Sequence, residues 1–261
     1  MGDRNSYSKT DPDATFMRMK DDHMMNGQLK TGYNVQLSSE NQFITNYALY
    51  QKTNDTNILI LFLNLFKNTY NIQSKTVVAD AGYGSLENYE YLEKEKIKPY
   101  VKYNYFHKSQ KKKHVQNPYV LDNLFYNEDE DYYVCPMGQH MINIGSKIRK
   151  TATSYEYKVE IYKAQNCNKC PLGGLCHKSK FDRVIEVNTK LNKHKTKVKE
   201  LLNSQEGIKH GGKRSIEPEA VFGHIKANNK FTRFFFFGIN KTELEFGLMA
   251  IGHNFRKLTK V

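Results

Sequence analysis

Apolar and polar residues alternate in the first clearly patterned stretch of the chain. Tyr33, Val35 and Leu37 lie on one side of this alternation, and a second apolar run extends over Phe43–Leu49. A period of two is typical of a strand with one buried face. The polar segment Ser38–Asn41 separates the two runs. The sequence therefore predicts a β-hairpin whose turn lies in this segment.

The apolar spacing changes to three and four residues after the hairpin, which predicts helices. Asp55 is placed to cap a helix that runs to about Tyr70, with an apolar stripe made of Ile58, Leu61, Phe62, Leu65 and Phe66. Ser85 opens a second helix that extends to about Lys96. Two short runs are predicted to be strands: Thr76–Ala79 and Pro99–Val101.

Two further helices are predicted near the C-terminus. The first opens at Ser215 or Glu217, has Pro218 in its first turn and continues to about Asn228. The second extends over about 242–258, and we expect its core-facing residues to be Leu244, Leu248, Ile251 and Phe255. The aromatic run Phe234–Phe237 is expected to be buried beside this helix rather than to stack on bases.

The order strand, strand, helix, strand, helix, strand predicts an α/β fold. Its first part extends over 32–102 and follows a segment, 1–31, that has no clear period and is expected to be irregular. Residues 103–199 break the pattern with basic runs, an acidic run at Glu128–Asp131, short β-like stretches and all four cysteines. We interpret them as a small β-rich insert, after which 200–261 completes the α/β unit with helices.

Basic residues outnumber acidic residues by 40 to 27, which gives a formal charge of +13. This excess favours a polyanionic partner, and nucleic acid is the first expectation, although any single cluster is equally typical of a solvated surface. The longest apolar stretch, Ile58–Phe66, is too short to span a bilayer, and the polar N-terminus lacks a signal-peptide pattern. We therefore expect a cytoplasmic protein. The basic clusters are Lys111–His114, Lys147–Lys150, Lys190–Lys199 and Arg256–Lys257.

Two acidic residues stand where binding sites are often found. Asp80 ends a β-branched strand and precedes Ala81-Gly82-Tyr83-Gly84, so its carboxylate is expected at the carboxyl edge of the sheet. Glu219 and Lys226 are seven residues apart and share one helix face. Taken alone, an aspartate after a strand is more often a capping residue, and such a helix face is more often ordinary solvated surface.

Three segments in a fixed order change this weighting. They are Gly32-Tyr33-Asn34-Val35-Gln36, Val78-Ala79-Asp80-Ala81-Gly82-Tyr83 and Glu219-Ala220-Val221-Phe222-Gly223-His224-Ile225-Lys226. Together with Arg233-Phe234, Gly238 and Glu245–Asn254, the series resembles the motifs of bacterial insertion-sequence DDE transposases. The match extends over nearly the whole chain, and the order and spacing of the motifs make it specific.

The resemblance implies a ribonuclease-H-like core in which two aspartates and a glutamate hold two divalent metal ions, Mg²⁺ or Mn²⁺. Asp80 matches the second aspartate and Glu219 the glutamate, with Glu217 as the alternative. Paired metal ions activate water or a DNA 3′-hydroxyl and stabilise the leaving oxygen. The implied partner is DNA, at transposon ends and target, bound by a homodimer. Basic residues near these acids are the implied DNA contacts: Arg214, Lys226, Lys213 and Arg233.

The N-terminal region departs from the family pattern. The family's first aspartate lies on a strand ahead of the hairpin, in an Asp-Gly-Thr-like setting, and nothing before Gly32 fits it. Asp11-Pro12-Asp13 is a turn signal without an apolar strand ahead of it, and Asp3 fits no better. In ribonuclease-H-like sheets the first strand lies between the hairpin and the strand with the second aspartate. We therefore expect a mixed sheet that lacks its first strand, in an inactive fragment.

Three functions are compatible with this reading. The family activity is metal-dependent cleavage and strand transfer of transposon-end DNA. A catalytically inactive DNA-binding remnant of a transposase is the alternative, because a metal ligand is missing. A metal-dependent nuclease with the same fold is the third, and joining of DNA ends would separate it from a transposase.

The cysteines form the other informative set. Cys167 and Cys170 have Cys-x-x-Cys spacing, Cys176 follows six residues later, and Cys135 precedes Pro136-Met137-Gly138. Four thiolates are a full tetrahedral set for structural Zn²⁺, with His177 and His140 as substitutes for a weak ligand. Four unconnected free cysteines are the alternative, since disulfides are rare in the cytoplasm. His210 and His224 lie near the proposed acids but are expected to face DNA or solvent, not to act as a general base.

Overall fold

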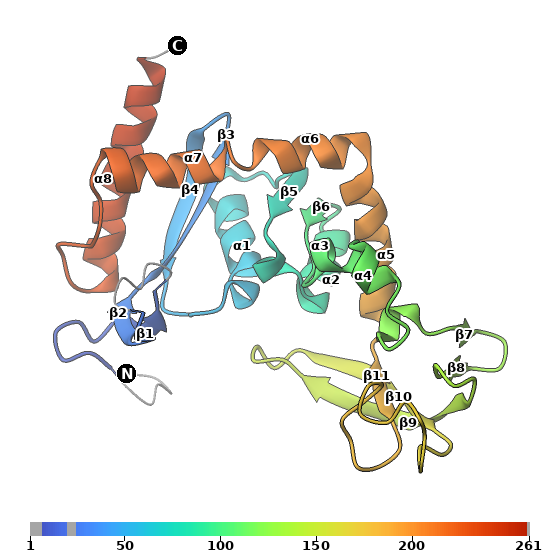
Figure 1. Ribbon diagram of the computed structural model, residues 1–261. Coiled ribbons are helices and arrows are strands. Elements are labelled where there is room, and N and C mark those ends of the chain that lie inside the picture. Colours follow the sequence, from blue (N-terminus) through green and yellow to red (C-terminus); the bar gives the residue numbers. More distant parts are fainter. Residues whose placement is uncertain (1–6, 20–24, 260–261) are drawn as a thin grey trace.

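The structure is a computed structural model, and it describes residues 7–19 and 25–259 (Figure 1). Asp3 lies outside the described residues. Three strand pairs and one larger sheet form the β-structure. The pairs are β1 (Thr15–Arg18) with β2 (Leu29–Gly32), antiparallel; β3 (Asn34–Glu40) with β4 (Phe43–Tyr50), antiparallel; and β5 (Thr76–Ala79) with β6 (Lys98–Val101), parallel.

The predicted hairpin is β3–β4, and the predicted strands at 76–79 and 99–101 are β5 and β6. The hairpin turn lies at Asn41 and Gln42, both with positive φ, and not at Ser38–Asn41. Two left-handed residues match the twist of a two-residue hairpin, which asparagine tolerates well. Ser38 and Ser39 remain in the strand, where the register shifts at a bulge. The segment expected to be irregular contains β1 and β2, whose short strands have no clear apolar period.

The α/β class is confirmed, but the expected mixed sheet is not formed as one sheet. The pair β3–β4 and the pair β5–β6 share no hydrogen-bonded ladder. Within the described residues, no strand pairs with the second edge of β3 or of β5. Side-chain packing must therefore hold the two pairs together.

Helix α1 (Leu59–Tyr70) lies between these strand pairs and follows a 3₁₀ turn at Asp55–Asn57. Asn54, not Asp55, caps this turn by accepting a hydrogen bond from the Thr56 amide. The buried positions differ in part from the predicted stripe, because Leu61 and Leu65 are exposed. One set of buried residues, Leu59 and Leu63, joins the core around β6, and another, Ile58 and Phe62, packs with Ala48 of β4.

The core around β5 and β6 is completed by α2 (Leu86–Lys94) and α5 (Thr189–Asn203). Ser85 caps α2 as predicted. Val198 and Leu202 of α5 pack in the same cluster as Tyr89 and Tyr100. The stretch 189–199, which was expected to belong to the insert, is therefore a helix of the α/β core. The many lysines in this stretch hid the apolar pattern of Val198 and Leu202, the two residues that the helix buries.

A second core lies between the β3–β4 hairpin and the C-terminal helices. After α6 (Gln205–Lys213), the predicted helix with Pro218 at its start is α7 (Pro218–Gly223), which continues as a π-helical turn, His224–Asn228. Helix α8 (Ile239–Leu258) follows. The buried residues of this core are Ile44, Leu49, Val221, Ile225, Phe246 and Ala250.

Helix α8 presents a different face to the core than its apolar spacing predicts. Leu244, Leu248, Ile251 and Phe255 are all exposed, while Phe246, Ala250 and His253 are buried. The aromatic run is also mostly exposed. Phe234 packs against Tyr33 and Phe231, but Phe235, Phe236 and Phe237 lie on the surface. Both expectations of burial were wrong at these positions.

The insert forms a five-stranded antiparallel sheet with its own core, which lies away from the strand pairs in Figure 1. Two short helices, α3 (Phe106–Ser109) and α4 (Lys112–Val115), precede it. Its buried residues include Met141, Tyr162 and Val187. The strand order is β11-β10-β9-β8-β7, with bounds β7 (Tyr126–Asn127), β8 (Tyr132–Val134), β9 (His140–Lys150), β10 (Glu156–Ala164) and β11 (Val184–Val187).

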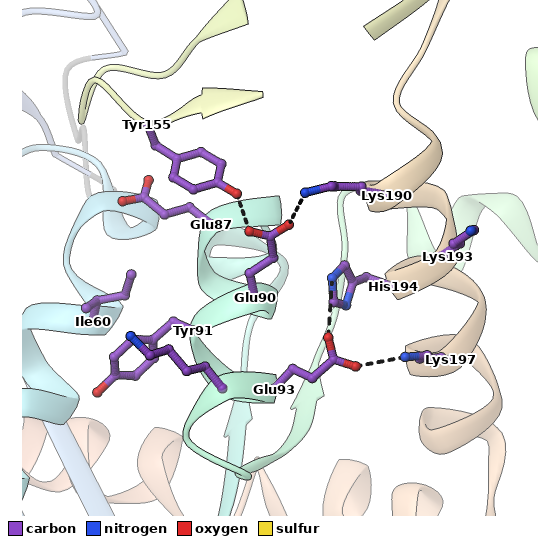
Figure 2. Close-up of a pocket in the computed structure, with 11 residues that line it drawn as sticks. Ile60, Glu87, Glu90, Tyr91, Glu93, Tyr155, Lys190, Lys193, His194 and Lys197 are labelled. Carbon is purple, nitrogen blue, oxygen red and sulfur yellow. Dashed lines mark hydrogen bonds and ion pairs between the residues drawn. The ribbon is translucent and has the colours of Figure 1, made fainter. Parts of the chain in front are cut away.

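The turn between β9 and β10 reaches back to the core at a groove of about 720 Å³ lined by α2 and α5 (Figure 2). Tyr155 donates its hydroxyl to Glu90, which also faces Lys190. Burial, followed by the hydrogen bond to Glu90, raises the pKa of Tyr155 to about 12. One turn along α2, Glu93 pairs with Lys197 at 2.8 Å. The acids of α2 thus pair with lysines of α5 and accept a hydrogen bond from the insert, so the groove links α2, α5 and the β9–β10 turn.

No helix among the described residues is long and apolar enough to cross a membrane.

The corner between α5 and α6 generates a stability prediction. A Cβ on Gly207 would lie 2.2 Å from the Leu201 carbonyl oxygen and 2.6 Å from that of Leu202. Because backbone cannot easily give way, we expect Gly207→Ala to lower the free energy of unfolding by about 1–3 kcal/mol. Urea denaturation measures this change.

Gly211→Ala is the matched control in the same helix, where an added Cβ meets nothing within 4 Å. Alanine should stabilise that position by up to about 1 kcal/mol, since it favours helix over glycine. Equal unfolding free energies for the two variants would contradict the close approach of α6 to the end of α5.

Candidate active site

Asp80 lies at the end of β5, directly before a 3₁₀ turn at Ala81–Tyr83. Its side chain is 60% exposed. Gly84 closes this segment, and a Cβ there would lie 2.3 Å from the Lys102 carbonyl oxygen. The loop after β5 therefore passes directly against the backbone that follows β6. This close approach explains the glycine and fixes where the Asp80 carboxylate projects.

Arg214 forms a bidentate ion pair with Asp80. Its Nη1 lies 2.6 Å from Asp80 Oδ1 and its Nη2 lies 2.7 Å from Oδ2. Arg214 stands at the C-terminal end of α6 and is only 16% exposed, so its guanidinium is held in place. A planar guanidinium matches both oxygens of a carboxylate at once, which makes this pair geometrically specific.

The same guanidinium reaches Glu219. Arg214 Nη2 lies 3.5 Å from Glu219 Oε1, and the Glu219 side chain is 62% exposed. Glu217, the alternative glutamate, has a different contact: its Oε2 accepts a hydrogen bond of 2.8 Å from the Gln42 amide at the hairpin turn. Glu219, rather than Glu217, therefore lies beside Asp80.

A polar network lies next to these residues and was missed by the sequence reasoning. Asp55 accepts hydrogen bonds from Asn34 at 2.8 Å and from Gln36 at 3.1 Å. Gln36 also accepts from the Tyr83 hydroxyl. Burial, and then the negative charge of Asp55, raise the pKa of Tyr83. The signal was present in the sequence, since Asn34 and Gln36 are polar residues on alternate positions of a strand.

Asp11 and Asp13 serve the fold in this structure. Asp11 is buried, accepts from the Tyr33 hydroxyl at 2.8 Å and from the Gly238 amide at 3.2 Å. Asp13 accepts from the Ile239 amide at 3.0 Å. These two carboxylates thus lie at the N-terminal end of α8, where the helix dipole favours negative charge. The predicted turn at this segment is present, because the Ala14 amide donates to the Asp11 carbonyl.

The basic residues expected to contact DNA are spread around the acidic pair. Lys213 ends α6 and is exposed, and Arg233 is exposed in the loop before α8. Lys226 is exposed in the π-helical turn, with its ammonium 6.0 Å from the Phe222 ring centroid. Of the four basic residues predicted to contact DNA, Arg214 is the one that pairs with Asp80 and Glu219. His210 packs on the Tyr100 ring, and this contact gives it no role as a general base.

Asp80 and Glu219 suit a hard divalent cation in their chemistry. Mg²⁺ is commonly held by one or two carboxylates together with waters and substrate phosphates. Across residues 7–19 and 25–259, however, no group of three or more His, Cys, Asp or Glu side chains is placed to hold a metal ion. Asp80 and Glu219 therefore do not by themselves complete a two-metal site in the part of the chain that the structure describes.

The four cysteines line one small cavity of about 20 Å³ in the insert. All four are free thiols. Arg183 is buried beside them, and its Nη1 donates to the Cys176 sulfur at 3.0 Å. The sulfurs do not form a closed set of three or more in the described residues, so the predicted tetrahedral zinc geometry is absent as the side chains stand. His177 also lines the cavity, while His140 stacks on Tyr132.

Residues 134–259, just under half of the chain, match a family model described as "Transposase DDE domain". These residues are similar to the transposase DDE domain family. The matched part begins in β8 and ends after α8, so it includes Glu219 and all four cysteines. The resemblance to a DDE transposase is thereby confirmed. The chain matches no curated protein and no solved structure.

The ion pair between Arg214 and Asp80 generates a second prediction. In a double-mutant cycle of Arg214→Gln and Asp80→Asn, we expect a coupling energy of about 1 kcal/mol, the upper end for an exposed pair. The matched cycle with Glu219→Gln should give less, since its single contact is 3.5 Å long. Urea denaturation at low salt measures both cycles.

Salt provides the control for this electrostatic origin. Both coupling energies should fall in about 1 M NaCl, where the Debye length is near 3 Å. A coupling to Glu219 that exceeds the coupling to Asp80 would contradict the observed geometry of the guanidinium.

Proposed function

We propose that the chain carries two of the metal-binding carboxylates of a DNA transposase, Asp80 and Glu219, and that its intact family activity is cleavage and strand transfer of transposon-end DNA. The observation that carries the proposal is the convergence of both carboxylates on Arg214. The two acids come from elements far apart in the sequence, and the family match extends over the second of them. An isolated capping aspartate would not require such a partner.

Each residue has a separate task in this proposal. Asp80 and Glu219 would hold Mg²⁺ or Mn²⁺, which when bound activates the attacking oxygen and stabilises the leaving oxygen at phosphorus. Arg214 would reduce the repulsion between the two carboxylates when no cation is bound, because its guanidinium pairs with both. When a cation and a phosphate enter, its guanidinium is free to turn to the phosphate, which it can also bind in a bidentate manner.

A third carboxylate is needed for the two-metal arrangement, and we propose that it belongs on an additional strand. The unpaired edges of β3 and β5 support this proposal. Tyr83, just after β5, reaches Gln36 of β3, so the two strands lie near each other. A strand between them would create the single ribonuclease-H-like mixed sheet and bring an acidic side chain beside Asp80. The chain described here is then catalytically silent by itself.

The third prediction tests the roles proposed for Asp80, Glu219 and the additional strand. The chain alone should bind DNA in a salt-dependent manner, because exposed Lys and Arg contact phosphates and release counterions. It should not cleave or join transposon-end DNA with Mg²⁺ or Mn²⁺. A version extended by an upstream Asp-bearing strand should gain both activities, and Asp80→Ala or Glu219→Ala should abolish them by a factor of about 10² or more.

Glu217→Ala is the matched control, because Glu217 contacts the hairpin turn. It should leave activity within a few-fold of the extended protein, and circular dichroism should show that all variants are folded. Cleavage by the chain without the added strand would overturn the proposed need for a third carboxylate. Loss of activity in Glu217→Ala, together with full activity in Glu219→Ala, would show that the wrong glutamate was chosen.

A DNA-binding remnant of a transposase is the second candidate function. The specific observation that favours it is that no three His, Cys, Asp or Glu side chains among the described residues are placed together to hold a metal ion. The extended protein separates the two functions, because a remnant would still bind DNA in a salt-dependent way and would not regain catalysis. A nuclease would cut DNA but would not join a supplied 3′-hydroxyl to it.

We also propose that the four cysteines bind one Zn²⁺ as a structural ion. Arg183 supports this, because it is buried and donates from Nη1 to the Cys176 sulfur at 3.0 Å and from Nη2 to the Tyr119 carbonyl oxygen at 2.8 Å, so a thiolate at Cys176 would lie beside a positive charge. Thiolates would favour that guanidinium, and all four cysteines line the same small cavity. A bound ion would tie Cys135, after β8, to the loop that carries the other three.

The fourth prediction follows from this zinc proposal. Freshly reduced protein should contain about one zinc ion per chain, because four thiolates are a full structural set. Elemental analysis of the Cys167→Ser/Cys170→Ser double variant should find none. Asp80→Asn is the control, since it alters the other acidic site and should keep the zinc. Reduced protein free of zinc, or a double variant that retains it, would rule the site out.

A further inference from the structure

The Gln36 side chain links the β3–β4 hairpin to the loop after β5. It is buried, and its Nε2 donates to Asp55 Oδ1 at 3.1 Å and to Asn34 Oδ1 at 2.7 Å. Its Oε1 accepts from the Tyr83 hydroxyl. A side-chain amide donates only from its nitrogen and accepts only at its oxygen. Turning the Gln36 amide over would therefore lose all three hydrogen bonds.

Asp55 determines which way that amide points. Its Oδ1 accepts from Gln36 and also from Asn34 Nδ2, the latter at 2.8 Å. An ionised carboxylate only accepts hydrogen bonds, so it requires the nitrogen, and not the oxygen, of each amide to face it. The Asn34 oxygen is thereby left to accept from Gln36, and the Gln36 oxygen is left to accept from Tyr83. The Asp55 carboxylate thus sets the order of donors and acceptors as far as Tyr83.

Tyr83 connects this series of hydrogen bonds to Asp80. It is the last residue of the 3₁₀ turn that Asp80 precedes, and its amide donates to the Asp80 carbonyl oxygen at 3.1 Å. Burial is the largest cause that raises the pKa of Tyr83, and the charge of Asp55 comes next. Asp80 raises this pKa further and Arg214 lowers it, so the hydroxyl lies within electrostatic reach of the ion pair. Tyr83 thus stands between the Asp55 carboxylate and the pair of Asp80 with Arg214.

Two other hydrogen bonds hold the same turn and bypass this series. Thr56 Oγ1 donates to the Gly82 carbonyl oxygen at 2.7 Å, and Asn88 Nδ2 donates to the Tyr83 carbonyl oxygen at 2.7 Å. They fasten the backbone of the turn to the segment before α1 and to α2. The bond from Tyr83 to Gln36 instead fastens the turn to β3. The two kinds of attachment depend on different residues, which can be altered one at a time.

We propose that Asp55 is a positioning residue for Asp80. It acts through Gln36 and Tyr83. Together they orient the turn so that both oxygens of Asp80 face Arg214. The catalytic meaning of this role rests on the proposed function, in which Asp80 binds a metal ion, because outer hydrogen bonds orient the ligands of a metal. The hydrogen-bonded series and its effect on the ion pair do not depend on that function.

The fifth prediction is that Asp55→Ala and Tyr83→Phe loosen the pair between Arg214 and Asp80, whose own hydrogen bonds involve neither residue. A bidentate pair slows rotation of a guanidinium about its Nε–Cζ bond, because both Nη groups are held. The two Nη groups of Arg214 should therefore give separate NMR signals in the wild-type chain, and Arg214→Gln identifies them. In Asp55→Ala and in Tyr83→Phe the signals should merge into one.

Thr56→Val is the matched control, because it removes a hydrogen bond to the same turn and leaves the series from Asp55 to Tyr83 intact. Its Arg214 signals should stay separate, and urea denaturation shows how far each variant is destabilised. A merely structural role would lower stability and leave the signals separate. If Asp55→Ala does not fold, Tyr83→Phe decides. Separate signals in Tyr83→Phe, merged signals in Thr56→Val or a merged signal in the wild-type chain would overturn the proposal.

Catalysis tests the same role in the protein extended by an Asp-bearing strand. Tyr83→Phe should lower kcat by about tenfold or more and leave KM for DNA within a few-fold, because outer partners orient a metal ligand. Thr56→Val should keep both values. Equal kcat in Tyr83→Phe and in the unsubstituted extended protein would overturn the role in catalysis. An extended protein without activity would instead refute the proposed function, and the NMR signals of the chain would still decide the role of Asp55.

Discussion

The packing of α1 against both strand pairs is the interaction on which the rest of the structure depends. The β3–β4 and β5–β6 pairs share no ladder of hydrogen bonds, so their relative position rests on side chains. Ile58, the N-cap of α1, and Phe62 pack with β4, while Leu59 and Leu63 pack with the cluster around β6. A helix that buries residues in two clusters transmits the position of one strand pair to the other. Because Asp80 follows β5 and Glu219 follows α6, their approach to Arg214 relies on this packing.

Local chemistry allowed several elements to be predicted from the sequence. The alternation of apolar and polar residues predicted the β3–β4 hairpin, Ser85 predicted the start of α2, and Pro218 predicted the start of α7. Each of these signals depends on a few neighbouring residues. The location of Asp80 at the end of a strand was likewise readable. The turn moved to Asn41 and Gln42, because the backbone twist of the hairpin outweighed the run of polar residues before it.

Other features depend on partners that are distant in sequence. Helix α8 has two sets of apolar residues, and only the position of β4 determines that Phe246 and Ala250 are covered while Leu248 is not. Arg214 was identified as basic and near the site, but its pairing with Asp80 requires the corner between α5 and α6, which a glycine at position 207 permits. The strands β1 and β2 show no alternation of apolar and polar residues, because each has only four residues and buries none of them. Asp55 was read as a helix cap, yet its carboxylate binds two side chains of β3.

The hairpin turn at Asn41 and Gln42 is bonded to three residues, one at the start of α7 and two on α8. Glu217 accepts from the Gln42 amide, His253 contacts the Gln42 carbonyl, and Lys257 donates to the Gln42 side chain at 2.8 Å. Turns at a protein surface usually tolerate added residues and are common sites of proteolysis. Here an added residue would break contacts to α7 and α8 together. The length of this turn is thus as constrained as a core position, and a tag, label or inserted domain belongs elsewhere in the protein.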